Sequence, residues 1–225
     1  MAGKPGFRVV SAWARPDAAH LSAFDGASSA QVADAMSRMG AMDGEIHPIW
    51  NSPRAIGPAV TVWCHSGDNL MLHKGISVAQ PGDIVVVNTQ GNCVNSPFGE
   101  LLATSAVRKG VRAVIIDGSV RDADGLRALG LAVYSRRISP SGCNKDGGGE
   151  VGTPIACGGI VVRSGDIVLA DADGVTVVPL ADAETVAALA KDQLKRENDR
   201  LSEIEKGVLT RPEIDEYLRR IKIIE

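Results

Sequence analysis

GELLATSAVRKGVRAVIIDGSVRDADGLRALG, residues 99–130, is the most informative stretch of this chain. The pattern predicts a helix over residues 100–109, a buried strand over 112–117 and a short helix that ends at Gly130. It follows PGDIVVVN, residues 81–88, which predicts a turn and a second buried strand. Because a helix between two buried strands is typical of a parallel β-α-β crossover, we expect an α/β fold.

The same stretch brings chemically useful residues to one edge of the predicted sheet. Gly99 and Glu100 open the helix, and the first backbone N–H groups of a helix have no acceptor within it, so they can bind an anion. Arg121 and Asp122 follow the next strand, and the carboxyl ends of parallel strands meet at one edge. An arginine beside a carboxylate suits an anionic substrate held next to a divalent cation. A surface Arg–Asp pair beside an ordinary helix start would give the same spacing.

The preceding part of the chain predicts a mixture of turns and single elements. Residues 1–27 are interrupted by Pro and Gly and predict an irregular lead-in. Apolar residues at helical spacing predict a helix over 28–40, and Pro and Gly then predict a loop over 41–58. A strand is expected over 59–64, followed by a helix over 68–79.

The following part predicts a glycine-rich loop and a set of hairpins. Residues 138–153 are expected to form a mobile loop. Strands are expected over 155–163, 167–170 and 175–178, joined by turns of Gly and Asp. SGDIVLAD, residues 164–171, is a near copy of the earlier PGDIVVVN, and we interpret both as a recurrent turn-and-strand device.

The C-terminal part predicts a long charged helix from residue 181, with a second short helix after Pro212. A narrow apolar stripe runs along the long helix, and such a stripe usually packs on a core or a neighbouring subunit. No linker of disordered composition divides the chain. We therefore expect one domain over residues 1–225, with a core over about 28–180 and C-terminal helices over about 181–221.

Composition excludes several classes of protein. The 225 residues include 24 Lys and Arg against 27 Asp and Glu, so the net charge of −3 gives no electrostatic reason to expect a nucleic-acid or membrane partner. The longest apolar runs, such as Ile84–Val87, are only long enough for strands. The N-terminus MAGKPGFRVV lacks the apolar region of a secretory signal, and the four Cys form no CxxC pair. We expect a cytoplasmic globular protein.

Four segments together resemble the RraA-like superfamily. They are Gly67-Asp68-Asn69, PGDIVVVN, the stretch that contains residues 99–130, and GGIVVRSGDIVLADADGVTVVP. Within that superfamily they resemble the class II pyruvate aldolases that cleave 4-hydroxy-4-methyl-2-oxoglutarate and 4-carboxy-4-hydroxy-2-oxoadipate. The signature of those enzymes is an acidic residue, twenty intervening residues and Arg-Asp, and Glu100 and Arg121-Asp122 have this spacing. The aldolases usually carry Asp at the first position, and Glu is one methylene longer.

The resemblance implies a swivelling β/β/α domain with a C-terminal helical tail, assembled into trimers or hexamers. It implies that Asp122 binds Mg²⁺ or Mn²⁺ directly and that Glu100 acts through a metal-bound water. Arg121 would contact the 2-keto oxygen of the substrate and stabilise the enolate that forms. The backbone at the helix start would hold the pyruvyl carboxylate through Gly99, Glu100, Leu101 and Leu102.

Two further site residues are implied by the same resemblance. Asn69 would line the pocket, and Glu197, from the C-terminal helix of a neighbouring subunit, would complete the metal site through water. A solvated helix face would equally account for Glu197. Asp68 precedes the predicted helix, so we expect it to act as a helix cap. The four His residues, which include His73, do not have the spacing of metal ligands. We expect them to be structural or at the surface.

The function we expect is divalent-metal-dependent cleavage of a 4-hydroxy-2-oxo di- or tricarboxylic acid to pyruvate and a second 2-oxo acid. Oxaloacetate decarboxylation is expected as a side activity because it passes through the same enolate. Two alternatives stay open: a dedicated oxaloacetate decarboxylase, and a regulator that binds a ribonuclease without catalysis. Glu100, Arg121 and Asp122 together favour an enzyme, because a regulator has no physical need for all three.

Overall fold

A parallel sheet with helical crossovers forms the centre of the computed structural model, which describes residues 2–225. Four strands follow one another across the sheet in chain order and run in the same direction. They are β4 (Ala55–Cys64), β5 (Ile84–Asn88), β6 (Ala113–Val120) and β7 (Ala132–Ile138). The crossovers are α3 (Leu70–Val78), α4 (Glu100–Arg108) and α5 (Ala123–Ala128). The α/β class is confirmed.

Short strands extend this sheet at both edges. Strand β8 (Gly149–Val151) pairs with β4, β2 (Phe7–Val9) and β1 (Ala2–Lys4) continue outward from it, and β3 (His47–Pro48) pairs with β7. The expectation of irregular structure throughout the lead-in, the loop before β4 and the glycine-rich loop is therefore wrong at these strands. Each of these strands has only two or three residues, which is too short for a periodic pattern in the sequence, so pairing with a neighbouring strand determines their conformation.

Strand β4 belongs to two sheets at once. Its second half, Ala59–Trp63, pairs in parallel with β5. Its first half, Ala55–Pro58, pairs antiparallel with β11 (Ile167–Asp171), which forms the predicted hairpin with β12 (Gly174–Val178). The prediction of a loop up to residue 58 is wrong here, because the antiparallel partner extends the strand backwards.

A second hairpin stands where one strand was expected. Residues 155–163 form β9 (Ile155–Cys157) and β10 (Ile160–Val162), which pair with each other. Gly158 and Gly159 separate them with φ angles of +57° and +81°. Both angles lie in the left-handed region, which glycine adopts at little cost, so the chain reverses at this pair.

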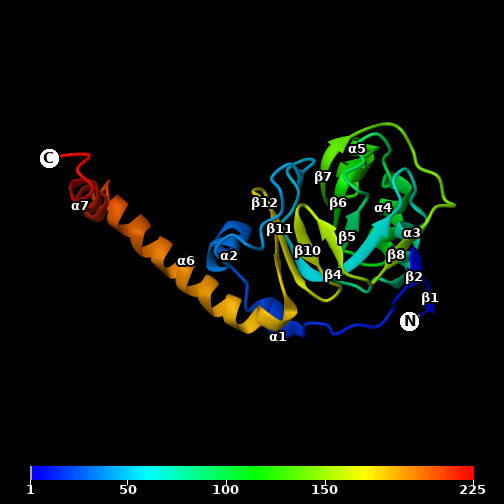
Figure 1. The fold of residues 1–225 in the computed structure, drawn as a ribbon, viewed down its shortest axis with the longest axis horizontal. Coiled ribbons are helices and arrows are strands. Elements are labelled where there is room, and N and C mark those ends of the chain that lie inside the picture. The colour runs from blue at the N-terminus through cyan, green and yellow to red at the C-terminus, as the bar shows by residue number, and fades with distance from the viewer. Residues whose placement is uncertain (1) are drawn as a thin grey trace.

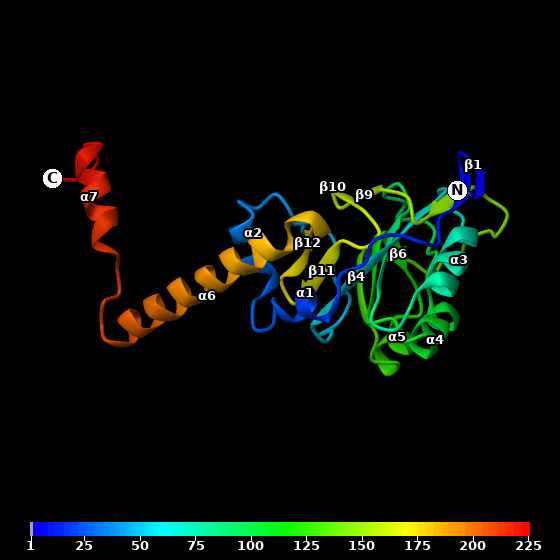
Figure 2. The same cartoon turned by 90° about the horizontal axis from the view of Figure 1, so that it is seen from below.

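Alternate side chains of the central strands face two different cores. In β5, Val85 and Val87 pack against the crossover helices, whereas Ile84 and Val86 pack against the layer formed by β9 to β12. Figure 2 shows α3, α4 and α5 on one side of the sheet and β9 to β12 on the other. Burial on both faces explains why these strands are continuous apolar runs rather than alternating ones.

The N-terminal helices cover the outer β layer. Helix α1 spans Ala18–Ser22, and α2 spans Ser29–Ala35 with Ser28 and Gln31 forming a capping box. Together with the start of α6, they pack on β11 and β12 to form a third core. Helix α2 ends before the predicted boundary at residue 40 because Ser37 and Arg38 adopt φ angles of +53° and +70°.

The C-terminal tail is helical, as expected. After a 3₁₀ turn, Leu180–Asp182, it forms α6 (Ala183–Glu205) and α7 (Pro212–Arg220). Figure 1 shows α6 leading away from the rest of the molecule and α7 at its far end. The buried residues of α6 all lie in its first eight positions, and the last of them is Ala190. Over residues 2–225, no helix is both long enough and apolar enough to cross a membrane.

Candidate active site

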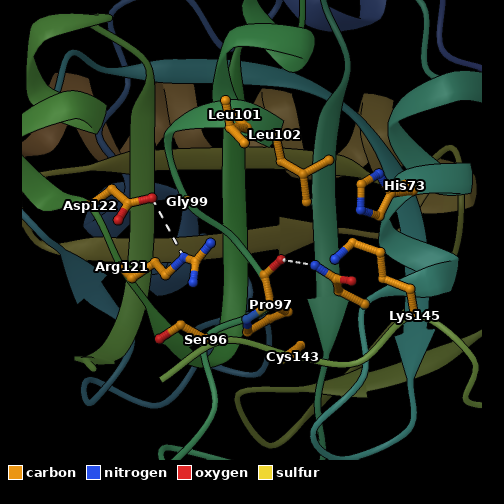
Figure 3. A pocket seen from close by; sticks show the side chains of 12 residues that line it. His73, Ser96, Pro97, Gly99, Leu101, Leu102, Arg121, Asp122, Cys143 and Lys145 are labelled. Atoms are coloured by element: carbon orange, nitrogen blue, oxygen red, sulfur yellow. Dashed lines mark hydrogen bonds and ion pairs between the residues drawn. The ribbon is translucent and has the colours of Figure 1, made fainter. Parts of the chain in front are cut away.

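A cavity of about 210 Å³ lies where β5 and β6 end (Figure 3). Its walls come from the start of α3, the segment that leads into α4, the end of β6 and the glycine-rich loop. The lining residues are Asn69, His73, Ser96, Pro97, Gly99, Leu101, Leu102, Arg121, Asp122, Gly142, Cys143 and Lys145. All the predicted site residues except Glu100 and Glu197 are among them. The parallel crossover explains this convergence, because the segments after β5 and β6 leave the same edge of the sheet.

Arg121 and Asp122 form an ion pair beside the first residue of α4. The Arg121 Nε lies 3.6 Å from Asp122 Oδ2. The backbone N–H of Glu100 donates to the same Oδ2 at 3.0 Å. One of the free N–H donors expected at this helix start is therefore already used by Asp122. Both side chains of the pair are 41% exposed, so a ligand in the cavity can reach them.

Two glycines leave the space that this ion pair occupies. A Cβ atom on Gly99 would lie 2.3 Å from Asp122 Oδ2 and 2.9 Å from Arg121 Cγ. A Cβ atom on Gly142 would lie 2.9 Å from a terminal nitrogen of Arg121. These distances are shorter than any real Cβ contact, so a side chain at Gly99 or Gly142 would displace the pair.

Glu100 turns its carboxylate toward α5 instead of lining the cavity. A Cβ atom on Gly125 would lie 2.6 Å from Glu100 Oε2, so the carboxylate rests directly against that glycine. Glu100 and Asp122 thus place two carboxylates around the start of α5, linked by the hydrogen bond from the Glu100 N–H to Asp122.

These two carboxylates are suitable ligands for a hard divalent cation. Mg²⁺ and Mn²⁺ prefer carboxylate oxygens and retain several waters, so they need few protein ligands. Across residues 2–225, no group of three or more His, Cys, Asp or Glu side chains is arranged to hold a metal ion. The donor set of Asp122 and Glu100 therefore fits such a cation if water, substrate or another subunit completes the coordination.

Glu197 lies on α6, away from the cavity of its own chain. Its carboxylate accepts hydrogen bonds from the side-chain amides of Gln31, on α2, and Gln193, one turn earlier on α6. A single chain therefore does not bring Glu197 to the predicted metal site, and its role in a neighbouring subunit stays a prediction.

Asn69 and His73, from the start of α3, also line the cavity, and His73 lies across it from the ion pair (Figure 3). The Asn69 Nδ2 donates to the carbonyl oxygen of Pro97 at 2.9 Å, which fixes the orientation of the amide. Its Oδ1 is buried and has no hydrogen-bond partner among the described residues. Burial and the nearby ammonium of Lys145 lower the pKa of His73, while Asp68 acts in the opposite direction. His73 is therefore predominantly neutral near pH 7.

The glycine-rich loop closes the remaining side of the cavity through Gly142, Cys143 and Lys145. Burial raises the pKa of the Cys143 thiol to about 11, so this cysteine stays protonated at neutral pH. The sequence pattern predicts neither these loop residues nor His73 as site residues. The only signal for them is that a glycine-rich loop follows the β-α-β unit, and the loop reaches the cavity by contacts that are distant in sequence.

Comparison with known proteins gives consistent matches. The family model RraA-like: Aldolase/RraA matches residues 29–177. A protein of Halalkalibacterium halodurans named "Putative 4-hydroxy-4-methyl-2-oxoglutarate aldolase" is 32% identical over 190 residues, which cover 84% of this chain and 89% of that protein. A relative from Ectopseudomonas mendocina with the same name is 29% identical over 56% of this chain and 76% of its own length.

Solved structures share the fold. The crystal structure of Streptomyces coelicolor RraAS2, described as an unusual member of the RNase ES inhibitor RraA protein family, superposes with a TM-score of 0.76. It is 27% identical and covers 84% of this chain and 98% of its own. The RNA-processing inhibitor RraA from Thermus thermophilis has a TM-score of 0.63 at 27% identity, over 68% of this chain and 93% of its own. The family model spans most of the chain and the resemblance in sequence extends to the fold, so this protein belongs to the RraA-like family.

Proposed function

We propose that this protein is a divalent-metal-dependent aldolase that cleaves a 4-hydroxy-2-oxo dicarboxylic or tricarboxylic acid into pyruvate and a second 2-oxo acid. The observation that carries the proposal is the Arg121–Asp122 ion pair, held at the start of α4 by the N–H of Glu100. The names of the relatives from Halalkalibacterium halodurans and Ectopseudomonas mendocina support the same class of reaction.

In this reaction the C4 hydroxyl loses its proton, the C3–C4 bond breaks and its electrons move to the C2 oxygen. The C4 carbon becomes the carbonyl of the second product, and the enolate is protonated at C3 to give pyruvate. The pyruvyl carboxylate would accept hydrogen bonds from the N–H groups of Leu101 and Leu102, which remain available after Glu100 has bound Asp122. Arg121 would donate to the C2 oxygen and stabilise the negative charge that develops there.

Asp122 and Glu100 would hold the cation. When bound, Mg²⁺ or Mn²⁺ supplies electrostatic stabilisation of the negative charge on the reacting oxygens. Asp122 also orients Arg121 through their ion pair, so its carboxylate has a role besides metal binding. Glu197 of a neighbouring subunit is a further proposed ligand, through water.

The opposite wall fits the other end of such a substrate. Lys145 carries a positive charge across the cavity from Arg121 (Figure 3), and would bind a carboxylate attached to C4. The C4 hydroxyl of the substrate is attached to the same carbon as this carboxylate, so it would lie on the same side of the cavity. Neutral His73 can accept the proton that this hydroxyl loses, because its pKa is lowered. Two cations at opposite ends favour a substrate with two separated carboxylates.

These features favour an enzyme over a binding protein that lacks catalysis. A surface that only docks another protein needs no partly enclosed cavity with a cation at each end. Oxaloacetate decarboxylation would use the same Arg121 and the same helix start, because it also forms the enolate of pyruvate.

The test is a coupled assay of pyruvate release with a panel of 4-hydroxy-2-oxo acids and oxaloacetate, with Mg²⁺, with Mn²⁺ and with a chelator. We expect cleavage of substrates that carry a carboxylate on C4, and loss of activity with the chelator. Decarboxylation of oxaloacetate alone would favour the dedicated decarboxylase. No turnover of any panel member with either metal would overturn the proposal.

A further inference from the structure

Lys145 lies in a segment that is attached to the start of α3 by backbone hydrogen bonds on both sides. The N–H of Asn144 donates to the carbonyl oxygen of Gly67 at 2.9 Å, and the N–H of Asn69 donates back to the carbonyl oxygen of Asn144 at 3.0 Å. This exchange fixes the residue that precedes Lys145.

Asp68 fixes the residues that follow Lys145. Its Oδ2 accepts hydrogen bonds from the N–H groups of Asp146 and Gly147 at 2.9 and 2.8 Å. Its Oδ1 accepts from the N–H of Leu70, the first residue of α3, at 2.8 Å, but Asn69 occupies the N-cap position, so the expectation that Asp68 is the helix cap is wrong. Only 3% of Asp68 is exposed, so this carboxylate is an internal connection between α3 and the glycine-rich loop.

Gly147 permits the close approach that these hydrogen bonds need. A Cβ atom at this position would lie 2.7 Å from Asp68 Cγ, which is closer than real Cβ contacts come. The loop therefore carries a glycine where the carboxylate of Asp68 touches it. A role limited to the start of α3 would require only the bond to Leu70 and would leave the contacts to the loop unexplained.

We propose that Asp68 is a positioning residue that holds Lys145 at the wall of the cavity and thereby sets the preference for substrates with a carboxylate on C4. This inference rests on the proposed function. Lysine has a long flexible side chain, so the position of its ammonium depends on how firmly its backbone is held. With residues on both sides of Lys145 bound to the start of α3, the backbone that carries this side chain is held at the side of the cavity that faces Arg121.

The variant Asp68→Asn keeps the shape of the side chain but reduces its capacity to accept hydrogen bonds. Its amide has a single acceptor oxygen, and its NH₂ group cannot accept from a backbone N–H. Asp68→Asn therefore cannot satisfy both Leu70 and the loop, and it leaves at least one buried N–H without a partner. Asp68→Glu keeps the charge but moves it by one methylene, which changes the geometry alone.

The first experiment compares two substrates. One is 4-hydroxy-4-methyl-2-oxoglutarate, and the other is 4-hydroxy-4-methyl-2-oxopentanoate, in which a methyl group replaces the carboxylate on C4. In Asp68→Asn and in Lys145→Met, we expect the ratio of kcat/KM for the first substrate to that for the second to fall about tenfold or more, mainly through KM. The double variant should show no further fall. Asp146→Asn, which changes an exposed carboxylate in the same segment, is the matched control.

Equal losses on both substrates in Asp68→Asn, or additive losses in the double variant, would overturn the inference and leave the proposed function intact. If the protein cleaves neither substrate, the proposed function fails, and the position of Lys145 is tested by a second measurement that needs no activity.

That measurement is an NMR titration of His73, assigned with a His73→Gln variant. The ammonium of Lys145 contributes to the lowered pKa of His73, so Lys145→Met should raise it. Asp68→Glu keeps the charge of residue 68, so a similar rise in this variant would report that Lys145 has moved. No rise in Asp68→Glu, with a clear rise in Lys145→Met, would overturn the inference. Circular dichroism and a thermal melt establish that each variant is folded.

Discussion

Asp122 occupies a backbone conformation that few residues other than glycine adopt, with φ of +57° and ψ of +44°. Asparagine and aspartate tolerate this region better than other side chains do. The residue precedes α5 but makes no capping hydrogen bond to it, because its carboxylate turns to Glu100 and Arg121 instead. The unusual backbone angle thus aims the carboxylate at the neighbouring helix start.

Asp122→Asn is the sharpest test of the charge at this position. Asparagine fits the left-handed conformation and keeps an acceptor for the Glu100 N–H, so the fold should survive. Because the charge is lost, we expect metal-dependent pyruvate release to fall by at least about a hundredfold. Asp124→Asn, at an exposed position two residues later, is the control and should retain activity. Full activity of Asp122→Asn at low metal concentration would exclude Asp122 as a ligand.

Arg121→Lys should impair the chemical step rather than binding. Lysine keeps the charge but lacks the planar fork of donors that can face both a keto oxygen and Asp122. Loss of one well-aimed donor to a developing oxyanion costs roughly 2.7–4 kcal/mol, or about two to three decades in kcat. Oxaloacetate decarboxylation should fall in parallel. A change confined to KM in steady-state kinetics would mean that Arg121 only positions the substrate.

Gly99→Ala tests the space beside the ion pair. The backbone of Gly99, with φ of −153°, is open to any residue, so the expected damage comes only from the added methyl group against Asp122 and Arg121. We expect a loss of kcat of about tenfold or more with little change in the melting temperature. Gly44→Ala is the matched control, because a Cβ atom there meets nothing within 4 Å. Equal activity of both variants would show that the pair tolerates displacement.

At the scale of elements, the two Gly-Asp turns show how one sequence device is used twice. Asp83 accepts a hydrogen bond from the N–H three residues earlier, at Gln80, and Asp166 accepts one from Arg163 in the same way. Each turn leads directly into a buried strand, β5 or β11. They differ in charge balance, since Arg15 forms an ion pair with Asp83, whereas Asp166 instead accepts a second backbone N–H, from Leu180.

Asp166 should make the stability of the protein depend on pH. Burial raises the pKa of this carboxyl above its usual value of 3.8, so the folded state binds its proton more tightly than the unfolded state does. The contribution of Asp166 to the free energy of unfolding is therefore greatest below about pH 4 and declines as pH rises through the raised pKa. In urea unfolding from about pH 4 upward, the free energy of unfolding should decline less with rising pH in Asp166→Asn than in the parent protein. An identical pH dependence of the free energy of unfolding in both proteins would contradict a raised pKa of Asp166.

The elements that could be predicted from sequence are those with local signals. The crossover from β5 to β6 has helical spacing, apolar runs and punctuating glycines, so α4 and the convergence of Glu100, Arg121 and Asp122 at one edge of the sheet could be predicted. The end of β6 could not, because the strand continues through an irregularity in register to Val120 instead of turning after Asp117. The far wall has no such signal. Lys145 reaches the cavity because Asp68 binds its neighbours across 78 and 79 residues of chain, and His73 occurs singly, without the spacing of a ligand pair.

At the scale of the whole molecule, the tail leaves apolar side chains about half exposed in the single chain. On α7, Ile214, Tyr217 and Ile221, the residue that ends the helix, lie at helical spacing and are 56%, 51% and 45% exposed. Exposed apolar residues in this arrangement favour contact with another copy, as predicted for the long helix.

We expect the protein to sediment as a trimer or hexamer and the double variant Ile214→Glu/Tyr217→Glu to dissociate. The charged residues would make burial of this helix face unfavourable. Glu216→Gln, at an exposed position on the same helix, is the control and should leave the assembly intact. A parent protein that is monomeric and fully active in sedimentation and assay would refute both the contact and the role of Glu197.

The dual membership of β4 has a consequence for the order in which the chain folds. Contacts among β4, β5, β6 and β7 join segments that are close in sequence, whereas β4 and β11 pair residues 55–58 with 167–170, more than a hundred positions apart. Closing so long a loop is slow, and during synthesis β11 emerges only after the parallel sheet is complete. Until then Ile84, Val86 and Ile115 lie on an uncovered apolar surface. A nascent chain stalled before β11 would therefore be a strong client for chaperones, and release from them would coincide with synthesis of the β11–β12 hairpin.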